Sequence, residues 1–496
     1  MTEQNQNVLN QEYDAKITCK YEGKIYNSNL KIEEPDPEIK NLRFLEKMNI
    51  QSLMIYICYD TCIKFRSDTI KELSFIKPWN QVLNYNINDL ELENLEVLKI
   101  EDNNLENDQL FNLSKFKKLH TLHISRNNVD LKNIHKVISL TKLSMQKCAL
   151  IEIDLIKSLV NLKDLDISYN KCIKDISPLF KLNNLVKVSL KNCGLYNIDL
   201  ISSLVNLQDL DLSKNTDLDL SPLCKLKSLT KLSMNNCDLK TIDQIAPLTN
   251  LEVLDISFNL LTNIDFIGQL INLKELYINN NENVNITPLK DLVGLIKLNI
   301  SGCGLIQLNA LKPLINLQNL EISYNFDINI TQLQYLKQLT HLNLDYCNIV
   351  SIYVLRPLAN LEELSMASNN IVYLDADVNE MQKLEYFRAE WNRISDFSSI
   401  KKHQNFNNHN KSNNKCFEIS YQEKPSLELL RKANKFRIIE RPNLQLKEIQ
   451  NKRQILKTAL NNCKQQINTV LNSANHNQFT SSIAHLFEKL NQPFSQ

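Results

Sequence analysis

The sequence contains very little glycine. Glycine occurs 6 times in 496 residues, whereas an average chain of this length carries ~35. Neither the GxGxxG fingerprint of dinucleotide-binding folds nor the GxxxxGK[ST] phosphate loop is present. The scarcity of glycine therefore excludes the common nucleotide-binding loops.

The chain also lacks an excess of charge of either sign and lacks long apolar runs. Lys and Arg total 57 against 56 for Asp and Glu, which leaves a net charge of +1. A protein that binds nucleic acid through bulk charge needs a basic excess. No uninterrupted apolar stretch approaches the ~18 residues of a membrane-spanning helix. We expect neither a nucleic-acid partner nor a membrane-spanning segment.

The first residues are polar and do not combine a basic segment with an apolar one, as a secretory signal would. The 12 cysteines are therefore interpreted as thiols of a reducing compartment rather than as disulfides. We expect a cytoplasmic protein, with the nucleus as an alternative. Hydrophobic residues make up 43% of the chain, which is enough for a large core.

What the sequence does contain is an internal repeat. The frame Leu-x-x-Leu-x-Leu-x-x-Asn/Cys-x-Leu is found 14 times, and positions are counted here from its first leucine. Weaker frames begin at Ile50 and Ile70. From Leu185 to Leu361 every step is 22 residues. The 14 frames begin at Leu95, Leu119, Leu140, Leu162, Leu185, Leu207, Leu229, Leu251, Leu273, Leu295, Leu317, Leu339, Leu361 and Leu384.

Each position of the frame has a physical explanation. The alternating leucines predict a short strand whose apolar side chains point inward. Asparagine at position 9 can bond backbone groups where the chain leaves the strand. Cysteine at this position is interpreted as a small buried core residue, rather than as a reactive thiol or metal ligand. The cysteines concerned are Cys148, Cys193, Cys237, Cys303 and Cys347.

The second half of each repeat predicts a short 3₁₀ or extended segment. It reads Ile-x-x-Ile-x-x-Leu, as in Ile173, Ile176 and Leu179, and proline recurs just before a leucine, as at Pro178. Proline fixes φ and removes a donor, which disfavours a full α-helix. The sequence therefore predicts a right-handed α/β solenoid, a horseshoe with a parallel concave sheet and short convex segments.

This pattern resembles the 22-residue leucine-rich repeats of two groups, the nuclear protein phosphatase-1 regulatory subunit and the bacterial internalins. The matching stretches run from Asn161 to Asn170 and from Leu251 to Asn259, and Asp175-Ile-Ser-Pro-Leu179 is internalin-like. The resemblance covers about 95–395. It implies a noncatalytic protein-binding solenoid and raises a phosphatase catalytic subunit as one candidate partner.

The strand positions 3, 5, 7 and 8 are expected to face outward. At position 3, Lys and Asp alternate from Lys142 to Lys231, which predicts a self-neutralising charge ladder. The C-terminal third carries aromatic, acidic and Arg side chains instead, the types that bind partner proteins. The residues predicted to bind a partner there are Tyr277, Glu321, Tyr324, Asp345, Tyr346, Glu363, Arg388 and Trp391. Trp391 has a second interpretation, as a cap over the last coil.

Four regions are expected along the chain. Residues 1–69 form an N-terminal cap with a degenerate repeat, 70–400 the solenoid and 401–424 a polar, Asn-rich linker. Residues 425–496 form a helical region with an apolar stripe from Ile449 to Val470. That stripe is typical of a short coiled coil, which would make homo-oligomers, or of a helix packed on the solenoid.

Chemistry is not indicated. Cys58-x₃-Cys62 lacks a second ligand pair at zinc spacing, and no nucleophile elbow, kinase signature or HExxH occurs. We therefore predict no enzyme, no metal and no cofactor. The predicted function is a protein-interaction scaffold or regulatory subunit. The alternatives are a structural component assembled through the C-terminal helix, or a secreted adhesin.

Overall fold

The computed structural model describes residues 29–32, 50–56, 65–76, 89–101, 113–127, 133–173, 175–374, 378, 380–394 and 417–418. The chain divides into two units, residues 1–434 and 435–496, and all described residues belong to the first. The predicted C-terminal helical region and its apolar stripe lie outside them.

Eighteen of the described strands form one long parallel sheet. Each strand pairs with the next coil in chain order, as β10 does with β9 and β11. The strands are β1 (Asn29–Ile32), β2 (Ser52–Tyr56), β4 (Glu72–Ile76), β6 (Val97–Glu101), β7 (Thr121–His123), β8 (Lys142–Ser144), β9 (Asp164–Asp166), β10 (Lys187–Ser189), β11 (Asp209–Asp211), β12 (Lys231–Ser233), β13 (Val253–Asp255), β14 (Glu275–Tyr277), β15 (Lys297–Asn299), β16 (Asn319–Glu321), β17 (His341–Asn343), β18 (Glu363–Ser365), β19 (Tyr386–Arg388) and β20 (Phe417–Glu418). A second sheet pairs β3 (Arg66–Ser67) with β5 (Glu91–Leu92).

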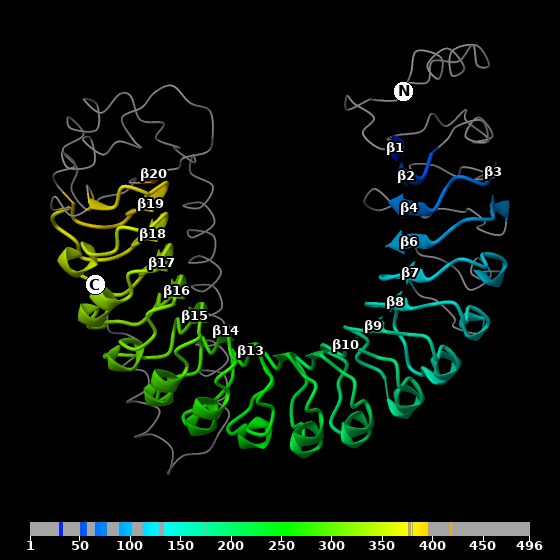
Figure 1. The fold of residues 1–496 in the computed structure, drawn as a ribbon, viewed down its shortest axis with the longest axis horizontal. Helices are drawn as coiled ribbons and strands as arrows, with labels where there is room; N and C mark the ends of the chain where they lie inside the picture. Colours follow the sequence, from blue (N-terminus) through cyan, green and yellow to red (C-terminus); the bar gives the residue numbers. More distant parts are fainter. Residues whose placement is uncertain are drawn as a thin grey trace, which may run out of the picture. The chain divides into compact units, whose positions relative to one another are not determined.

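Short 3₁₀ helices make the return segments of the coils, and Figure 1 shows them on the side opposite the strands. Pro178, Pro222 and Pro288 each lie in the first turn of one of them, where a missing N–H costs nothing. The helices are η4 (Leu113–Lys115), η5 (Ile134–Lys136), η6 (Asp154–Ser158), η7 (Ser177–Lys181), η8 (Asp199–Ser203), η9 (Ser221–Lys225), η10 (Asp243–Ile245), η11 (Asp265–Gln269), η12 (Thr287–Asp291), η13 (Asn309–Leu311), η14 (Thr331–Tyr335) and η15 (Tyr353–Leu355). The predicted solenoid architecture is confirmed.

The core lies between these two layers. The apolar residues of positions 1, 4 and 6 are buried in coil after coil, as are Leu207, Leu210 and Leu212. Because each coil's apolar side chains pack against those of its two neighbours, one continuous core runs along the stack. Among the described residues, no helix combines the length and apolar character that crossing a membrane requires.

Position 9 holds the turn that follows each strand. The side-chain Oδ1 of Asn325 accepts the backbone N–H groups of Cys303 and Leu305 in the preceding coil, at 3.1 and 3.0 Å. Its Nδ2 donates to the carbonyl oxygens of Ile300 and Ile322, at 3.0 and 2.8 Å. One buried amide thus satisfies four backbone groups of two coils. The same four contacts recur at Asn170, Asn215, Asn259 and Asn369.

A cysteine at position 9 makes only part of these contacts with the backbone. Cys303 is buried, and its Sγ donates to the carbonyl oxygen of Ile278 at 3.3 Å. Burial raises the pKa of this thiol to about 11, so it stays protonated and unreactive at neutral pH. Its interpretation as a core residue is confirmed, and the same holds for Cys148, Cys193, Cys237 and Cys347.

The sheet extends beyond the regular repeat at both ends. Strands β1 and β2 lie within residues 1–69, and β20 lies within 401–424. The segments expected to form a cap and a linker therefore each contribute strands to the sheet. The region boundaries themselves stay predictions.

Substitutions at position 9 test whether the stability of the fold depends more on asparagine or on cysteine there. Asn325→Ala leaves four buried backbone groups without their partner, and an unsatisfied group costs about 1–3 kcal/mol. We expect a loss of at least about 2 kcal/mol in the free energy of unfolding. Cys303→Ala, the matched control one coil earlier, removes one weak donor and is expected to cost about 1 kcal/mol or less. Urea denaturation of both variants measures the difference, and equal losses would contradict this role of asparagine.

Candidate functional site

In every coil from Leu119 to Leu384, the residue at position 8 lies just beyond the C-terminal end of the strand. These strand ends together form the rim of the sheet, which is called the sheet edge below. The backbone φ at position 8 is positive, at 58° for Tyr324, 57° for Tyr346 and 54° for Trp391. This left-handed conformation turns the chain sharply out of the strand. The row it creates is Arg126, Lys147, Tyr169, Asn192, Lys214, Asn236, Phe258, Asn280, Gly302, Tyr324, Tyr346, Ser368 and Trp391.

Neighbours in this row contact one another. The rings of Tyr324 and Tyr346 stack with their centroids 4.5 Å apart and their planes 8° from parallel, which matches the ~4.8 Å spacing of adjacent strands. Both remain well exposed, at 52% and 40%. The pKa of the Tyr324 phenol is raised by burial, by Tyr346 and by Asp345. The structure therefore brings together two of the predicted partner-binding residues as one rigid aromatic surface.

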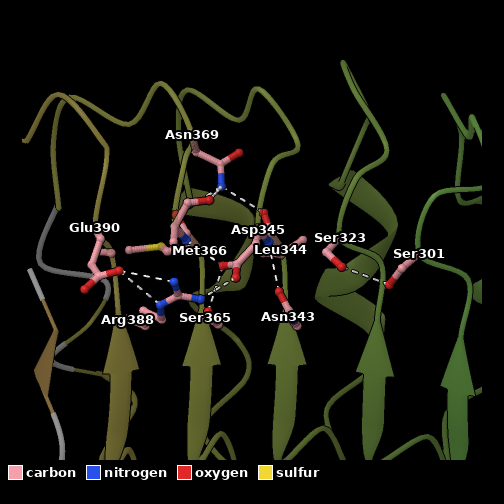
Figure 2. A network of polar contacts seen from close by, with 12 residues as sticks. Ser301, Ser323, Asn343, Leu344, Asp345, Ser365, Met366, Asn369, Arg388 and Glu390 are labelled. Atoms are coloured by element: carbon pink, nitrogen blue, oxygen red, sulfur yellow. Dashed lines mark hydrogen bonds and ion pairs between the residues drawn. The ribbon is translucent and has the colours of Figure 1, made fainter. Parts of the chain in front are cut away.

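Beside the tyrosines lies a polar network that spans three coils (Figure 2). Asp345 is almost fully buried, and its carboxylate accepts hydrogen bonds from the Ser365 hydroxyl at 2.7 Å and from the Ala367 N–H at 2.6 Å. Its other oxygen accepts from a terminal guanidinium nitrogen of Arg388 at 2.8 Å. Arg388 also donates to Glu390 at 3.2 and 3.3 Å. Asp345 and Arg388 thus hold one another across β18.

Two further predicted residues, Glu321 and Glu363, add negative charge to this face. Burial raises the pKa of Glu321, and neighbouring Asp345 and Glu363 raise it further, against a hydrogen bond from Asn343. Glu363 is half exposed and lies 3.5 Å from the Nε2 of His341. Because Arg388 is matched by Asp345 and Glu390, it does not offset these carboxylates.

Tyr277 stands apart from this group. Its hydroxyl donates to Glu275 at 2.8 Å. Burial, together with this hydrogen bond, raises the pKa of Tyr277 to about 12. Glu275 in turn pairs with Lys297 at 2.9 Å. Tyr277 is therefore tied to the charge ladder of its own coils rather than to the Tyr324–Tyr346 pair.

The predicted charge ladder is present along position 3. The ammonium of Lys142 lies 2.9 Å from Asp164, and that of Lys187 lies 3.1 Å from Asp209. Adjacent parallel strands in register place these residues side by side. The N-terminal part of the sheet face therefore neutralises itself, as expected for exposed pairs of small energetic value.

The C-terminal part of the sheet face does not neutralise itself. Positions 3, 5, 7 and 8 of the six coils from Leu273 to Leu384 carry five acidic and two basic residues, a net charge of −3. The corresponding positions of the six coils from Leu140 to Leu251 carry five acidic and six basic residues, a net charge of +1. The acidic set is Glu275, Glu321, Asp345, Glu363 and Glu390, and the basic set is Lys297 and Arg388.

Trp391 ends the position-8 row of the repeat. It is 46% exposed and stands two coils beyond Tyr346, with Ser368 between them. This placement is compatible with both of its interpretations, partner binding and capping. Within the described parts of the chain, no group of three or more His, Cys, Asp and Glu side chains is arranged to hold a metal ion.

Comparison with known proteins agrees with this architecture. A family model described as leucine-rich repeats (two copies) matches residues 138–181, 227–270 and 249–291. An internalin (InlF) from Listeria monocytogenes has a similar structure, with 27% sequence identity and a TM-score of 0.54, over 59% of this chain and 86% of that one. The structure is a leucine-rich-repeat solenoid.

A second solved structure is comparably similar to this solenoid. A leucine-rich-repeat protein of Leptospira interrogans is 25% identical, with a TM-score of 0.50, over 63% of this chain and 76% of that one. No curated protein matches the chain significantly. The predicted resemblance to internalins is confirmed, whereas the resemblance to the phosphatase regulator stays a prediction.

The Asp345–Arg388 pair can be tested by a double-mutant cycle. Arg388→Ala leaves a buried carboxylate without its cation, and we expect a loss of about 1–3 kcal/mol in unfolding free energy. Asp345→Asn in the same chain should recover part of that loss, because the pair is coupled. Lys187→Ala, which breaks an exposed ion pair of the N-terminal coils, should cost under about 1 kcal/mol. Additive effects of the two substitutions would contradict the proposed coupling.

The raised pKa of Glu321 predicts how the stability of the protein depends on pH. Its pKa in the folded protein lies above the ordinary value of 4.5, so its ionisation disfavours folding at higher pH. Glu321→Gln should therefore raise the thermal unfolding midpoint at neutral pH. The gain should vanish as the pH falls below 4.5, where the unfolded carboxyl is also protonated. A gain that persists unchanged at low pH would show that the charge is not its cause.

Proposed function

We propose that this protein is a noncatalytic scaffold or regulatory subunit that binds a partner protein through the C-terminal part of its sheet face. The stacked pair of Tyr324 and Tyr346 supports this proposal most strongly. Two large aromatic side chains left exposed on a rigid sheet edge have no evident part in the fold, because the core is complete beneath them. Leucine-rich-repeat proteins generally act as interaction scaffolds, which agrees with it.

The chemistry of the surface is suited to protein recognition. Tyrosine rings bury a large area on binding and lose little conformational freedom, most of all when stacking has already fixed them. The left-handed turn of position 8 further restricts where each ring can lie. Asp345 and Arg388 act as positioning residues, because their ion pair joins the coil of Tyr346 to the coil of β19.

The net charge of this surface favours a basic partner. Five carboxylates against two cations attract a partner segment rich in Lys or Arg and slow the approach of an acidic one. A phosphatase catalytic subunit remains one candidate partner, on the resemblance of the repeats alone. We further propose a cytoplasmic or nuclear location, and homo-oligomers through residues 425–496 remain the structural alternative.

The similarity to an internalin favours a second candidate function, that of a secreted adhesin. This alternative places the protein in the culture medium or at the cell surface. Cell fractionation with an antibody to the chain separates it from the first proposal.

The proposed surface predicts a specific loss of partner binding. Full-length protein carrying Tyr324→Ala and Tyr346→Ala should retain the partner at least ~10-fold less well than the native chain, since both rings lose their buried area. Affinity capture from native lysate with quantitative mass spectrometry identifies the partner, and purified components then give the dissociation constant.

Tyr196→Ala is the matched control. Tyr196 is 73% exposed and lies outside the strand positions of its coil, so its loss should leave binding unchanged. If the double variant folds and binds the partner as tightly as the native protein, the aromatic pair is not the binding surface.

A further inference from the structure

The Tyr324 ring has one face that no position-8 side chain covers. Tyr346 stacks on the face directed toward the C-terminal end of the repeat. The opposite face is directed along the row toward the preceding coil, where position 8 is Gly302. Glycine has no side chain to cover this face, and Tyr324 is 52% exposed. The position-8 row therefore lacks a side chain at Gly302, directly beside its aromatic pair. This place in the row is called the Gly302 step below, or the unfilled step.

The backbone does not require glycine at this step. The φ of Gly302 is 63°, but Phe258 and Asn280 adopt 55° and 56° at the same position of the two preceding coils. What glycine does provide is space. A Cβ atom at Gly302 would lie 2.7 Å from Oδ1 of Asn280, so any side chain there would displace this amide and occupy the space in front of the Tyr324 ring.

The strand spacing sets the distance available at this step. Position 8 of the Asn280 coil and of the Tyr324 coil are two strand spacings apart, or about 9.6 Å. A group stacked on the ring at the usual contact distance of about 3.5–4.0 Å then lies over Gly302, with the Asn280 amide beyond it. This spacing matches the thickness of one planar side chain of an extended partner segment.

The surroundings select the kind of flat group. Oδ1 of Asn280 is a hydrogen-bond acceptor at this step. Next to it, at position 7, the hydroxyls of Ser301 and Ser323 bond one another at 3.0 Å (Figure 2). The outward positions of the six coils from Leu273 to Leu384, to which these residues belong, carry a net charge of −3. A guanidinium is planar, positively charged and rich in donors, and it stacks on aromatic rings. An ammonium is not planar, and a Phe, Tyr or Trp ring carries no charge and at most one donor.

We propose that the step above Gly302 is an arginine subsite, in which the guanidinium of a partner arginine stacks on the open face of Tyr324 and donates to Asn280. The inference rests on the proposed function, since it names the side chain that the sheet face would recognise. Gly302 is then a specificity residue, because its missing side chain keeps the ring face accessible.

Short peptides of identical length test the subsite directly. The probes are blocked oligo-arginine, oligo-lysine and oligo-citrulline, and calorimetry at low ionic strength measures their binding to the full chain. We expect oligo-arginine to bind at least ~10-fold more tightly than either other peptide, because only it is both planar and charged. Equal affinity for oligo-lysine or for oligo-citrulline would overturn the proposal.

Substitutions that add a side chain at Gly302 test the subsite, and the same change in an N-terminal coil is the control. Gly302→Phe should lower oligo-arginine affinity by ~10-fold or more, since the new ring occupies the stacking position. Asn236→Phe makes the same change at position 8 of a coil in the N-terminal half, where φ is 57°, and should have no effect. Gly302→Asn is a second, milder variant, because Asn192, Asn236 and Asn280 adopt this conformation. It keeps the test open should Gly302→Phe fail to fold.

Unchanged oligo-arginine affinity in a folded Gly302 variant would overturn the subsite. The proposed function can fail separately. If the Tyr324→Ala and Tyr346→Ala variant loses the cellular partner while Gly302 variants bind oligo-arginine normally, the surface stands and the arginine subsite falls. If the Gly302 variants lose oligo-arginine but the double tyrosine variant keeps the cellular partner, the subsite exists and the proposed function is wrong.

Discussion

The backbone of a tight coil has to satisfy its polar groups after every strand, and the rest of this structure depends on how it does so. Position 9 supplies the answer, with one buried asparagine such as Asn325 bridging four backbone groups of two coils. This contact holds adjacent coils in a fixed register. It follows the left-handed residue at position 8, so the turn that the amide stabilises also orients the side chain projecting from the sheet edge.

Because the register is fixed, side chains at the same position meet their counterparts one coil away. The ~4.8 Å strand spacing suits both ion pairs at position 3 and ring stacking at position 8, as in Lys187–Asp209 and Tyr324–Tyr346. Residues that are 22 positions apart in the sequence therefore form columns of neighbouring side chains along the sheet. In the N-terminal half of the sheet face these columns form ion pairs that neutralise one another. In the C-terminal half they form an aromatic pair on a surface of net negative charge.

Much of this arrangement could be predicted from the repeat. The spacing of the leucines locates the strands, the prolines indicate 3₁₀ segments, and the columns place Tyr324 beside Tyr346. Contacts that cross more than one coil could not be predicted, since Arg388 reaches Asp345 past a whole strand. The strand β20 could not be predicted either, because Phe387 and its partner Phe417 are 30 residues apart, whereas the repeat has 22. The sequence contains no motif for the role of Gly302, because a missing side chain forms no pattern. Three signals could have marked it: its place in the position-8 column, the rarity of glycine in this chain and its tyrosine neighbour.

Hydrogen–deuterium exchange on the full chain, with and without the captured partner, tests the central claim most directly. If the C-terminal part of the sheet face is the binding surface, protection appears in peptides that span the strands and turns from about 273 to 394. Peptides that cover the coils from about 140 to 260 then exchange as in the free protein. Protection confined to those N-terminal coils, or to the 3₁₀ helices on the opposite side, would contradict it.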